Sequence, residues 1–326
     1  MLTKSSIRTY GAVLVIVICL NFLLPRLLPG GPLDYIEGSD SGAIVTEAQR
    51  NAILEYYQLN ESTTVQFLHY VKGVFTFDFG ISFIYKAPVR DLLISYLPNT
   101  LLIVGIASVI STIIGIIAGL LAGWWNGRKM EQSLLYAVLT ISAIPEFLIG
   151  LVLLLLLAVQ VQWFPLSGAQ TPFLRDATWW HMVIDRMYHA TLPIITLVVV
   201  NIASVYLMMR NSAIEILREP FIEFAKVKGI SRKRILLTHL GKAAILPVFT
   251  LIMIRLSTLF TGAVFVETVF SYPGIGRLLQ EAIMARDYPL MHGLFFVFTI
   301  IVLLFNAIAD VMYVRLDPRM KSGAEE

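Results

Sequence analysis

Side chains that could perform chemistry are sparse in this sequence, and their spacing matches no catalytic or metal-binding set. Five histidines are present, and no two of them are four residues apart, as two zinc ligands on one helix face would be. They are His69, His181, His189, His239 and His292. The single cysteine, Cys19, excludes an intramolecular disulfide and a Cys-based metal site. A glycine-rich phosphate loop, an H-E-x-x-H zinc motif and a G-x-S-x-G nucleophile motif are all absent from the sequence. We therefore expect no catalytic residue, no metal and no cofactor.

The composition indicates a membrane protein. Of the residues, 57% are hydrophobic and 14% charged, and the mean hydropathy is +0.76, which a soluble domain covered in charge would not show. The net charge is only +3, and the basic residues gather in short loops, so nucleic acid is not an expected partner. A helix needs roughly 20 apolar residues to cross a bilayer. Six segments approach this length, which predicts an all-α polytopic protein with six transmembrane helices: 10–28, 99–124, 134–159, 191–209, 243–266 and 290–314.

The distribution of lysine and arginine predicts the orientation of these helices. The loop 210–242 is far too basic to cross a bilayer, so the positive-inside rule places it in the cytosol together with both termini. The expected organisation is an N-terminal transmembrane helix (1–28), an extracytoplasmic insertion (29–98), a five-helix core (99–314) with a cytosolic loop (213–242), and a cytosolic tail (315–326).

Glycine and proline mark special positions in the expected helices. Gly115, Gly119 and Gly123 are spaced four residues apart, so they lie on one helix face and allow another backbone to approach closely. The spacing favours packing within the subunit but leaves packing against a second subunit open. Pro145 and Pro247 are expected to kink or break the third and fifth spans.

Several motifs resemble those of one transporter family. Glu223, Ala225 and Gly229 have the spacing of the EAA loop of ABC-importer permeases, although Phe224 stands where a second alanine is usual. Further segments resemble the dipeptide, oligopeptide and nickel permeases in the same order along the chain: LPGGPLD at 28–34, FDFGIS at 77–82, LPNTL at 97–101, WFPLSG at 163–168, ETVFSYPGIGRLLQEAIMARDYPL at 267–290 and ADVMYVRLDPRM at 310–320. The resemblance implies a type I ABC-importer permease fold with an outer insertion after the first helix.

The resemblance also implies a role for the basic loop. It implies two short helices whose turn inserts into a cytosolic ATPase, through Glu223, Phe224, Ala225, Lys228, Gly229, Ile230, Ser231 and Pro247. Independently, Gly229 permits the backbone conformation that ends a helix, and the Ser231 hydroxyl is suited to cap the next one. The implied partners are a second, homologous permease, two cytosolic ABC ATPases, an extracytoplasmic substrate-binding protein and the lipid bilayer. The chain would be a non-catalytic, multi-pass subunit in a bacterial or archaeal cell membrane.

Two further groups of residues are candidates for substrate passage. Arg255 lies eight residues after Pro247, roughly 12 Å along a helix, and an arginine at such a depth normally faces a cavity or a partner. We expect it to face the substrate path and contact a substrate carboxylate; the alternative is a structural ion pair, for which Glu267 lies too far along the same helix. Pro273, Gly274 and Gly276 predict a turn before a short amphipathic helix, which would form an outer gate or a plain connecting loop.

The substrate itself is not encoded in any motif. Di- or oligopeptides are the first expectation, and nickel or a metal chelate is the alternative within the same family. A secondary transporter or channel would show inverted repeats and intramembrane acids, for which only Glu146 and Asp310 are candidates. An intramembrane enzyme would need a catalytic constellation that the sequence lacks.

Overall fold

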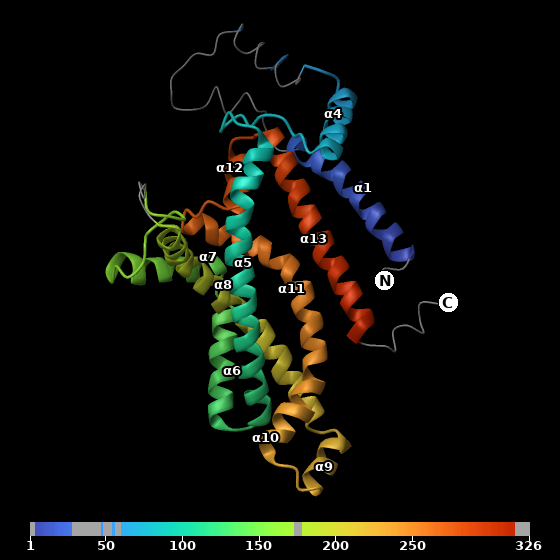
Figure 1. Ribbon diagram of the computed structural model, residues 1–326, viewed down its shortest axis with the longest axis vertical. Coiled ribbons are helices and arrows are strands. Elements are labelled where there is room, and N and C mark those ends of the chain that lie inside the picture. The colour runs from blue at the N-terminus through green and yellow to red at the C-terminus, as the bar shows by residue number, and fades with distance from the viewer. Residues whose placement is uncertain (1–3, 28–46, 48–53, 56–59, 173–177, 317–326) are drawn as a thin grey trace. The chain divides into compact units, whose positions relative to one another are not determined.

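The computed structural model describes residues 4–27, 47, 54–55, 60–172 and 178–316, and these residues are mostly helical (Figure 1). Their only extended pairing is an isolated antiparallel bridge between Ile81 and Pro88. The motif at 28–34, much of the expected outer insertion and the C-terminal tail lie outside the described residues. The chain divides into two units: unit 1 contains 100–273 and 304–326, and unit 2 contains 2–99 and 274–303.

Unit 1 is a helical core with two short helices at one end. Its elements are the greater part of α5 (Val89–Trp124), α6 (Lys129–Ser142), α7 (Glu146–Leu153), the π-helix η1 (Leu154–Gln160), α8 (Trp179–Ile216), α9 (Pro220–Val227), α10 (Arg232–Arg234), the π-helix η2 (Ile235–Leu240), α11 (Gly241–Val269) and the last part of α13 (Tyr288–Leu316). A buried cluster joins Leu120 of α5, Met209 of α8 and Val248 of α11. These three helices therefore form the centre of the unit.

The glycine ladder packs inside the subunit. A Cβ at Gly115 would lie 2.7 Å from the Val205 Cβ, and a Cβ at Gly119 would lie 2.6 Å from the Tyr206 carbonyl oxygen. A Cβ at Gly123 would lie 2.6 Å from the Cβ of Ala213. All three glycines thus face α8 at separations that no side chain permits. The preference for packing within the subunit is confirmed.

The third expected span is broken. α6 ends at Ser142, Pro145 occupies the N-cap of α7, and the two helical stretches Lys129–Ser142 and Glu146–Gln160 are bent by 99°. Proline lacks a backbone N–H and clashes with the preceding turn, so it starts a new helix here. Pro247, in contrast, lies inside the continuous helix α11.

Four helical segments of the described chain are long and apolar enough to cross a membrane, or five if the bent pair counts as one span. The four are Arg8–Leu27, Val89–Trp124, Trp179–Ile216 and Tyr288–Met312. The fifth expected span, 243–266, coincides with α11, which is 29 residues long but is not among these candidates. A multi-pass helical protein is confirmed, but the count of six is not.

Unit 2 contains α1 (Lys4–Leu27), α4 (Thr63–Thr76), the start of α5, α12 (Ile275–Met284) and the start of α13. Figure 1 shows α4 next to the C-terminal end of α1. The Asn21 side chain of α1 donates to the Thr299 hydroxyl of α13 at 3.4 Å. Gly293 of α13 lies against Val89, where a Cβ would be 2.6 Å from a Val89 methyl group. The starts of α5 and α13 are therefore packed in close contact.

Candidate functional site

The turn between α9 and α10 has a defined backbone motif. Pro220 begins α9, where its missing N–H costs nothing, and Lys228 is the C-cap of this helix. Gly229 then takes a left-handed φ of +72°, the Gly229 N–H donates to Lys226 O at 3.0 Å, and the Ile230 N–H donates to Ala225 O at 3.2 Å. This is the Schellman pattern, in which two end carbonyls of a helix are satisfied by the turn that follows. The predicted role of Gly229 in ending the helix is confirmed.

One face of α9 anchors the turn to the core. Ile222 and Ala225 are buried together with Ile235 of η2, and Trp124 at the end of α5 packs against the same cluster. Ala225 is 3% exposed, so the motif alanine lies in the interior of this small core. A larger side chain there would separate α9 from η2.

The other face of α9 is exposed and apolar. The exposed fraction is 61% for Phe224 and 85% for Val227, and Phe221 is also exposed. Glu223 lies exposed on the same short helix. We call Phe221, Glu223, Phe224 and Val227 the α9 face. A cluster of large apolar side chains exposed at a helical turn is typical of an interaction surface.

Basic residues surround the α9 face. The Lys228 ammonium lies 4.7 Å from the centre of the Phe224 ring, a cation–π contact. Lys226 and the three residues of α10 are also exposed. Ser231 occupies the N-cap of α10, but its side chain makes no capping hydrogen bond. The expectation that the Ser231 hydroxyl caps this helix is wrong; its backbone carbonyl accepts from Arg234 and Ile235 instead, both at 3.0 Å.

Buried polar contacts hold this end of unit 1 together. Arg210 of α8 pairs with the buried Glu131 of α6 at 2.6 Å, and Glu131 also accepts from the Gly127 N–H in the turn between α5 and α6. The Ser212 hydroxyl donates to the Ala244 carbonyl of α11 at 3.1 Å. Figure 1 shows α9 and α10 at the same end of the unit as the α5–α6 turn. Pro247 lies further along α11, outside the α9–α10 turn.

Arg255 lies exposed on α11 and interacts electrostatically with Glu146, the first residue of α7. Gly262 follows Arg255 by seven residues, two helix turns, so both lie on one face of α11. A Cβ on Gly262 would lie 2.3 Å from the Glu146 carboxylate, and one buried oxygen of that carboxylate has no hydrogen-bond partner among the described residues. The glycine makes room for a carboxylate beside a cationic helix face.

Glu267, the other candidate for substrate passage, is fully buried. Its carboxylate accepts the Thr100 hydroxyl at 2.6 Å, and its backbone carbonyl accepts the Tyr272 N–H at 2.8 Å. Two of the sequence motifs, LPNTL and ETVFSYPG, therefore meet through one hydrogen bond between α5 and α11. In the structure, a charged residue of another element that interacts with Arg255 is Glu146.

The segment after α11 forms the predicted turn and amphipathic helix. Gly274 is the N-cap of α12, and the buried residues of α12 include Ile275, Gly276, Leu278 and Ala282. Before the turn, the Phe270 carbonyl accepts the Gly168 N–H at 3.3 Å, which joins the WFPLSG and FSYPG motifs. Pro273 is the last residue of the segment 100–273 of unit 1.

A buried aspartate organises unit 2 at the other end of α12. The Asp287 carboxylate accepts the Ser82 hydroxyl at 2.5 Å, the Ile84 N–H at 3.2 Å and the Leu290 N–H at 3.1 Å. Burial raises the pKa of Asp287 above its usual value, and these donors oppose the rise. Nearby, the Tyr85 hydroxyl donates to Glu281; burial and this bond raise the pKa of Tyr85, which keeps the phenol protonated.

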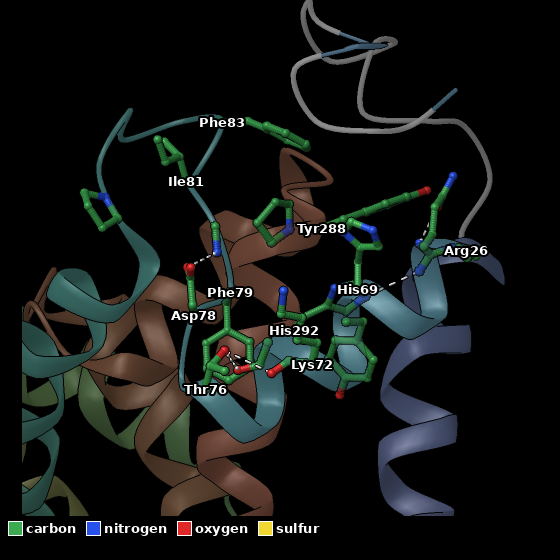
Figure 2. A pocket seen from close by; sticks show the side chains of 16 residues that line it. Arg26, His69, Lys72, Thr76, Asp78, Phe79, Ile81, Phe83, Tyr288 and His292 are labelled. Atoms are coloured by element: carbon green, nitrogen blue, oxygen red, sulfur yellow. Dashed lines mark hydrogen bonds between the residues drawn. The ribbon is translucent and has the colours of Figure 1, made fainter. Parts of the chain in front are cut away.

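Unit 2 also contains a cavity of about 590 Å³ (Figure 2). It is lined by α4, the ends of α1 and α13, and the segment 78–88. Its polar lining includes Arg26, His69, Lys72, Asp78 and His292. No group of three or more His, Cys, Asp or Glu residues suited to a metal ion is found in the described part of the chain.

The fold and the site define an all-helical, multi-pass membrane transport subunit of the ABC-importer permease class. The chain belongs to the family of binding-protein-dependent transport system inner membrane components, whose family model matches residues 92–322. This confirms the family resemblance found in the sequence motifs.

Three curated relatives span almost the whole chain. The oligopeptide transport system permease protein AppB of Bacillus subtilis is 29% identical, with 95% of each chain covered. The probable peptide ABC transporter permease protein y4tP of Sinorhizobium fredii is 34% identical over 95% of this chain and 96% of its own. The dipeptide transport system permease protein DppB of Escherichia coli is 31% identical, with 93% of each covered.

A solved structure supports the fold. The matched chain belongs to the MetNI methionine ABC transporter in an inward-facing conformation, with a TM-score of 0.57 and 18% sequence identity. It covers 69% of this chain and 96% of that chain. At this identity the match establishes the architecture alone.

Sequence reasoning missed several site residues. Val227 is exposed but is not part of any family motif. Its position one turn after Phe224 on an amphipathic helix could have indicated that both side chains lie on the same exposed face. The Glu131–Arg210 pair joins residues 79 positions apart, and the Ser82–Asp287 hydrogen bond joins residues 205 positions apart. No local sequence pattern predicts either contact.

Proposed function

We propose that this chain is the permease subunit of an ATP-driven importer of di- or oligopeptides, with the 213–242 loop coupled to cytosolic ATPases. The observation that carries the proposal is the α9 face, an exposed apolar surface held on a rigid, internally packed turn. A partner that binds this face would remove Phe224 and Val227 from water, and apolar burial stabilises by about 25 cal/mol per Å².

The turn is suited to transmit force. The Schellman hydrogen bonds fix α9 relative to the residues that follow, and the Ile222–Ala225–Ile235 cluster fixes it to η2 and to the end of α5. A push on the α9 face would therefore move helix ends instead of deforming a loop. The coupling residues in this proposal are Glu223, Phe224, Ala225, Lys228, Gly229, Ile230 and Ser231, with Pro247 further along α11.

The proposed orientation places this turn and both termini in the cytosol. The exposed lysines and arginines around the α9 face follow the positive-inside rule. Segments 29–98, 160–190 and 267–289 then face outward, where Pro273, Gly274 and Gly276 with α12 would form part of an outer gate. A substrate-binding protein would meet this side, and a second, homologous permease would complete the path.

Arg255 is proposed to face the substrate path, with Glu146 balancing its charge. Glu267 is the second proposed residue of this region, and its bond to Thr100 suits it to position α11 against α5. A path that carries one cationic and one anionic side chain matches the two charged ends of a zwitterionic peptide. Peptide as substrate is supported by the names of the relatives, which refer to oligopeptides, peptides and dipeptides.

The test is uptake of labelled di- and tripeptides, compared with labelled nickel, in cells with the gene, without it, and with Gly229→Asp. We expect peptide uptake to disappear in the deletion and to fall in the variant, while the variant protein remains in the membrane. Loss of nickel uptake alone would replace the peptide assignment with metal import. Normal transport by Gly229→Asp would reject the coupling role of the turn.

A further inference from the structure

The cavity of unit 2 lies where two candidate membrane spans end. Arg26 is the penultimate residue of the span Arg8–Leu27, and Tyr288 is the first residue of the span Tyr288–Met312. Figure 2 shows Arg26 at the end of α1. Arginine and tyrosine at such positions lie at the level of the lipid headgroups. The cavity therefore opens at the boundary between the apolar zone and water.

The cationic groups of this cavity lack an acidic partner in the described chain. The Arg26 guanidinium donates to Phe22 O at 2.8 Å and to Gln66 Oε1 at 2.7 Å, and it lies 3.6 Å from the centre of the Phe22 ring. Among the described residues, no ion pair joins Arg26 or Lys72 to a carboxylate. Asp78 also lines the cavity, but Figure 2 shows it on the opposite side from Arg26, where it accepts the Gly80 N–H at 3.1 Å.

The helix that forms one wall of the cavity has an apolar side that suits a membrane surface. Leu68 and Phe75 of α4 are seven residues apart, so they lie on one helix face, and their exposed fractions are 60% and 82%. The residues of α4 that line the cavity, among them His69 and Lys72, lie on the adjoining faces. A helix with basic residues beside exposed large apolar side chains is typical of an interfacial helix.

We propose that this cavity binds the phosphate group of a membrane phospholipid. The Arg26 guanidinium contacts Phe22, Gln66 and, through Nη1 at 3.4 Å, the His292 ring. Its remaining N–H groups are offered to phosphate oxygens, and Lys72 adds a second positive charge. The acyl chains of the same lipid would cover Leu68 and Phe75. One lipid would thus join α4 to the ends of α1 and α13.

Inorganic phosphate carries the same charged oxygen atoms as a phospholipid headgroup, but the position of the cavity favours the lipid as its ligand. A headgroup at the end of two spans is present at the high local concentration of the bilayer. An inorganic phosphate ion would fill little of a 590 Å³ cavity and would leave Leu68 and Phe75 exposed to water.

The test uses the assembled transporter, extracted from membranes that contain phosphatidylglycerol and analysed by native mass spectrometry for retained lipid. The variants are Arg26→Gln, Lys72→Gln and the double variant, with Arg90→Gln as the control, because Arg90 is an exposed arginine of the same unit that does not line the cavity. We expect the double variant to retain phosphatidylglycerol at least about tenfold less than the wild type, since each charge-assisted contact contributes on that scale. Lys72 is exposed, so Lys72→Gln alone preserves the fold and should show a smaller loss.

Unchanged lipid retention in the double variant, or an equal loss in Arg90→Gln, would overturn the proposal. A second arm adds inorganic phosphate during extraction. Retention that is insensitive to millimolar phosphate supports a lipid site, whereas complete displacement by phosphate would reassign the cavity to a soluble anion and reject the lipid.

Discussion

Gly229 offers the sharpest test of coupling, because its substitution perturbs conformation without a steric clash. Its φ is +72°, and a Cβ added there would meet nothing within 4 Å. An alanine must therefore adopt a left-handed conformation, which costs about 1–2 kcal/mol, and no second cause contributes. This free energy corresponds to roughly a 5- to 30-fold loss in the population of the native turn relative to frayed alternatives. Asparagine tolerates the same conformation and should restore most of that population.

A matched control exists in the same unit. Gly127, in the turn between α5 and α6, has a φ of +82° and also has nothing within 4 Å of an added Cβ. Gly127→Ala thus carries the same conformational cost at a turn that lacks the α9 face. The assay is ATP hydrolysis stimulated by the substrate-binding protein, together with peptide uptake, both in proteoliposomes and normalised to the amount of assembled transporter.

We expect Gly229→Ala to lower stimulated hydrolysis and uptake severalfold, Gly229→Asn to lower them less, and Gly127→Ala to leave the normalised rates near wild type. The coupling role of the turn would be refuted by equal normalised rates for Gly229→Ala and wild type. Equal losses in Gly229→Ala and Gly127→Ala would show that backbone strain anywhere in unit 1 has this effect, which also contradicts a specific role.

Three further perturbations follow from the helix packing and from the contacts of charged side chains. Gly119→Ala should lower the thermal unfolding temperature of the purified transporter, because overpacking against α8 costs about 1–3 kcal/mol. The control is Gly105→Ala on the same helix, where an added Cβ meets nothing within 4 Å, and it should leave the unfolding temperature unchanged or raise it. Equal unfolding temperatures for the two variants would contradict the close packing at Gly119. Asp287→Ala leaves three donors unsatisfied and should destabilise unit 2 by about 3 kcal/mol. Asp287→Asn keeps one acceptor and should lower the unfolding temperature less. An Asp287→Ala variant with the unfolding temperature of the wild type would argue against this hydrogen-bond network. Arg255→Gln should reduce the abundance of the protein in the membrane, because Glu146 loses its counter-charge. Adding Glu146→Gln should restore the abundance but not peptide uptake. Full uptake by the double variant would dismiss the substrate role of Arg255.

The local parts of the site could be predicted from sequence because their causes are local. Gly229 follows a short helix and precedes a second one, and a glycine at that position predicts a turn with a left-handed backbone conformation. The Gly115–Gly119–Gly123 spacing likewise predicted that another helix packs closely against this face, and Pro145 predicted a break in the third span. Ser231 shows the limit of such rules, since a residue suited to capping takes the N-cap position without using its hydroxyl.

The rest depends on contacts that no local pattern contains. The sequence places Arg255 and Glu267 on the same expected helix, but an acid that interacts with Arg255 comes from α7, 109 residues earlier in the chain. Gly262, which makes room for Glu146, looked like any other glycine in an apolar helix. The count of six spans is not confirmed, because a 99° bend between α6 and α7 divides one apolar run into two short helices and α11 is not among the membrane-span candidates.

The α9 face also has a consequence for the life of the protein in the cell. A chain that has been inserted into the membrane but has not met its partner presents Phe224 and Val227 to water. Exposed apolar side chains are the feature by which chaperones and proteases select incompletely assembled proteins, and they favour self-association. The same side chains proposed to receive force in the finished transporter would then mark the orphan subunit for removal, so that the amount of this chain in the membrane follows the supply of its partner.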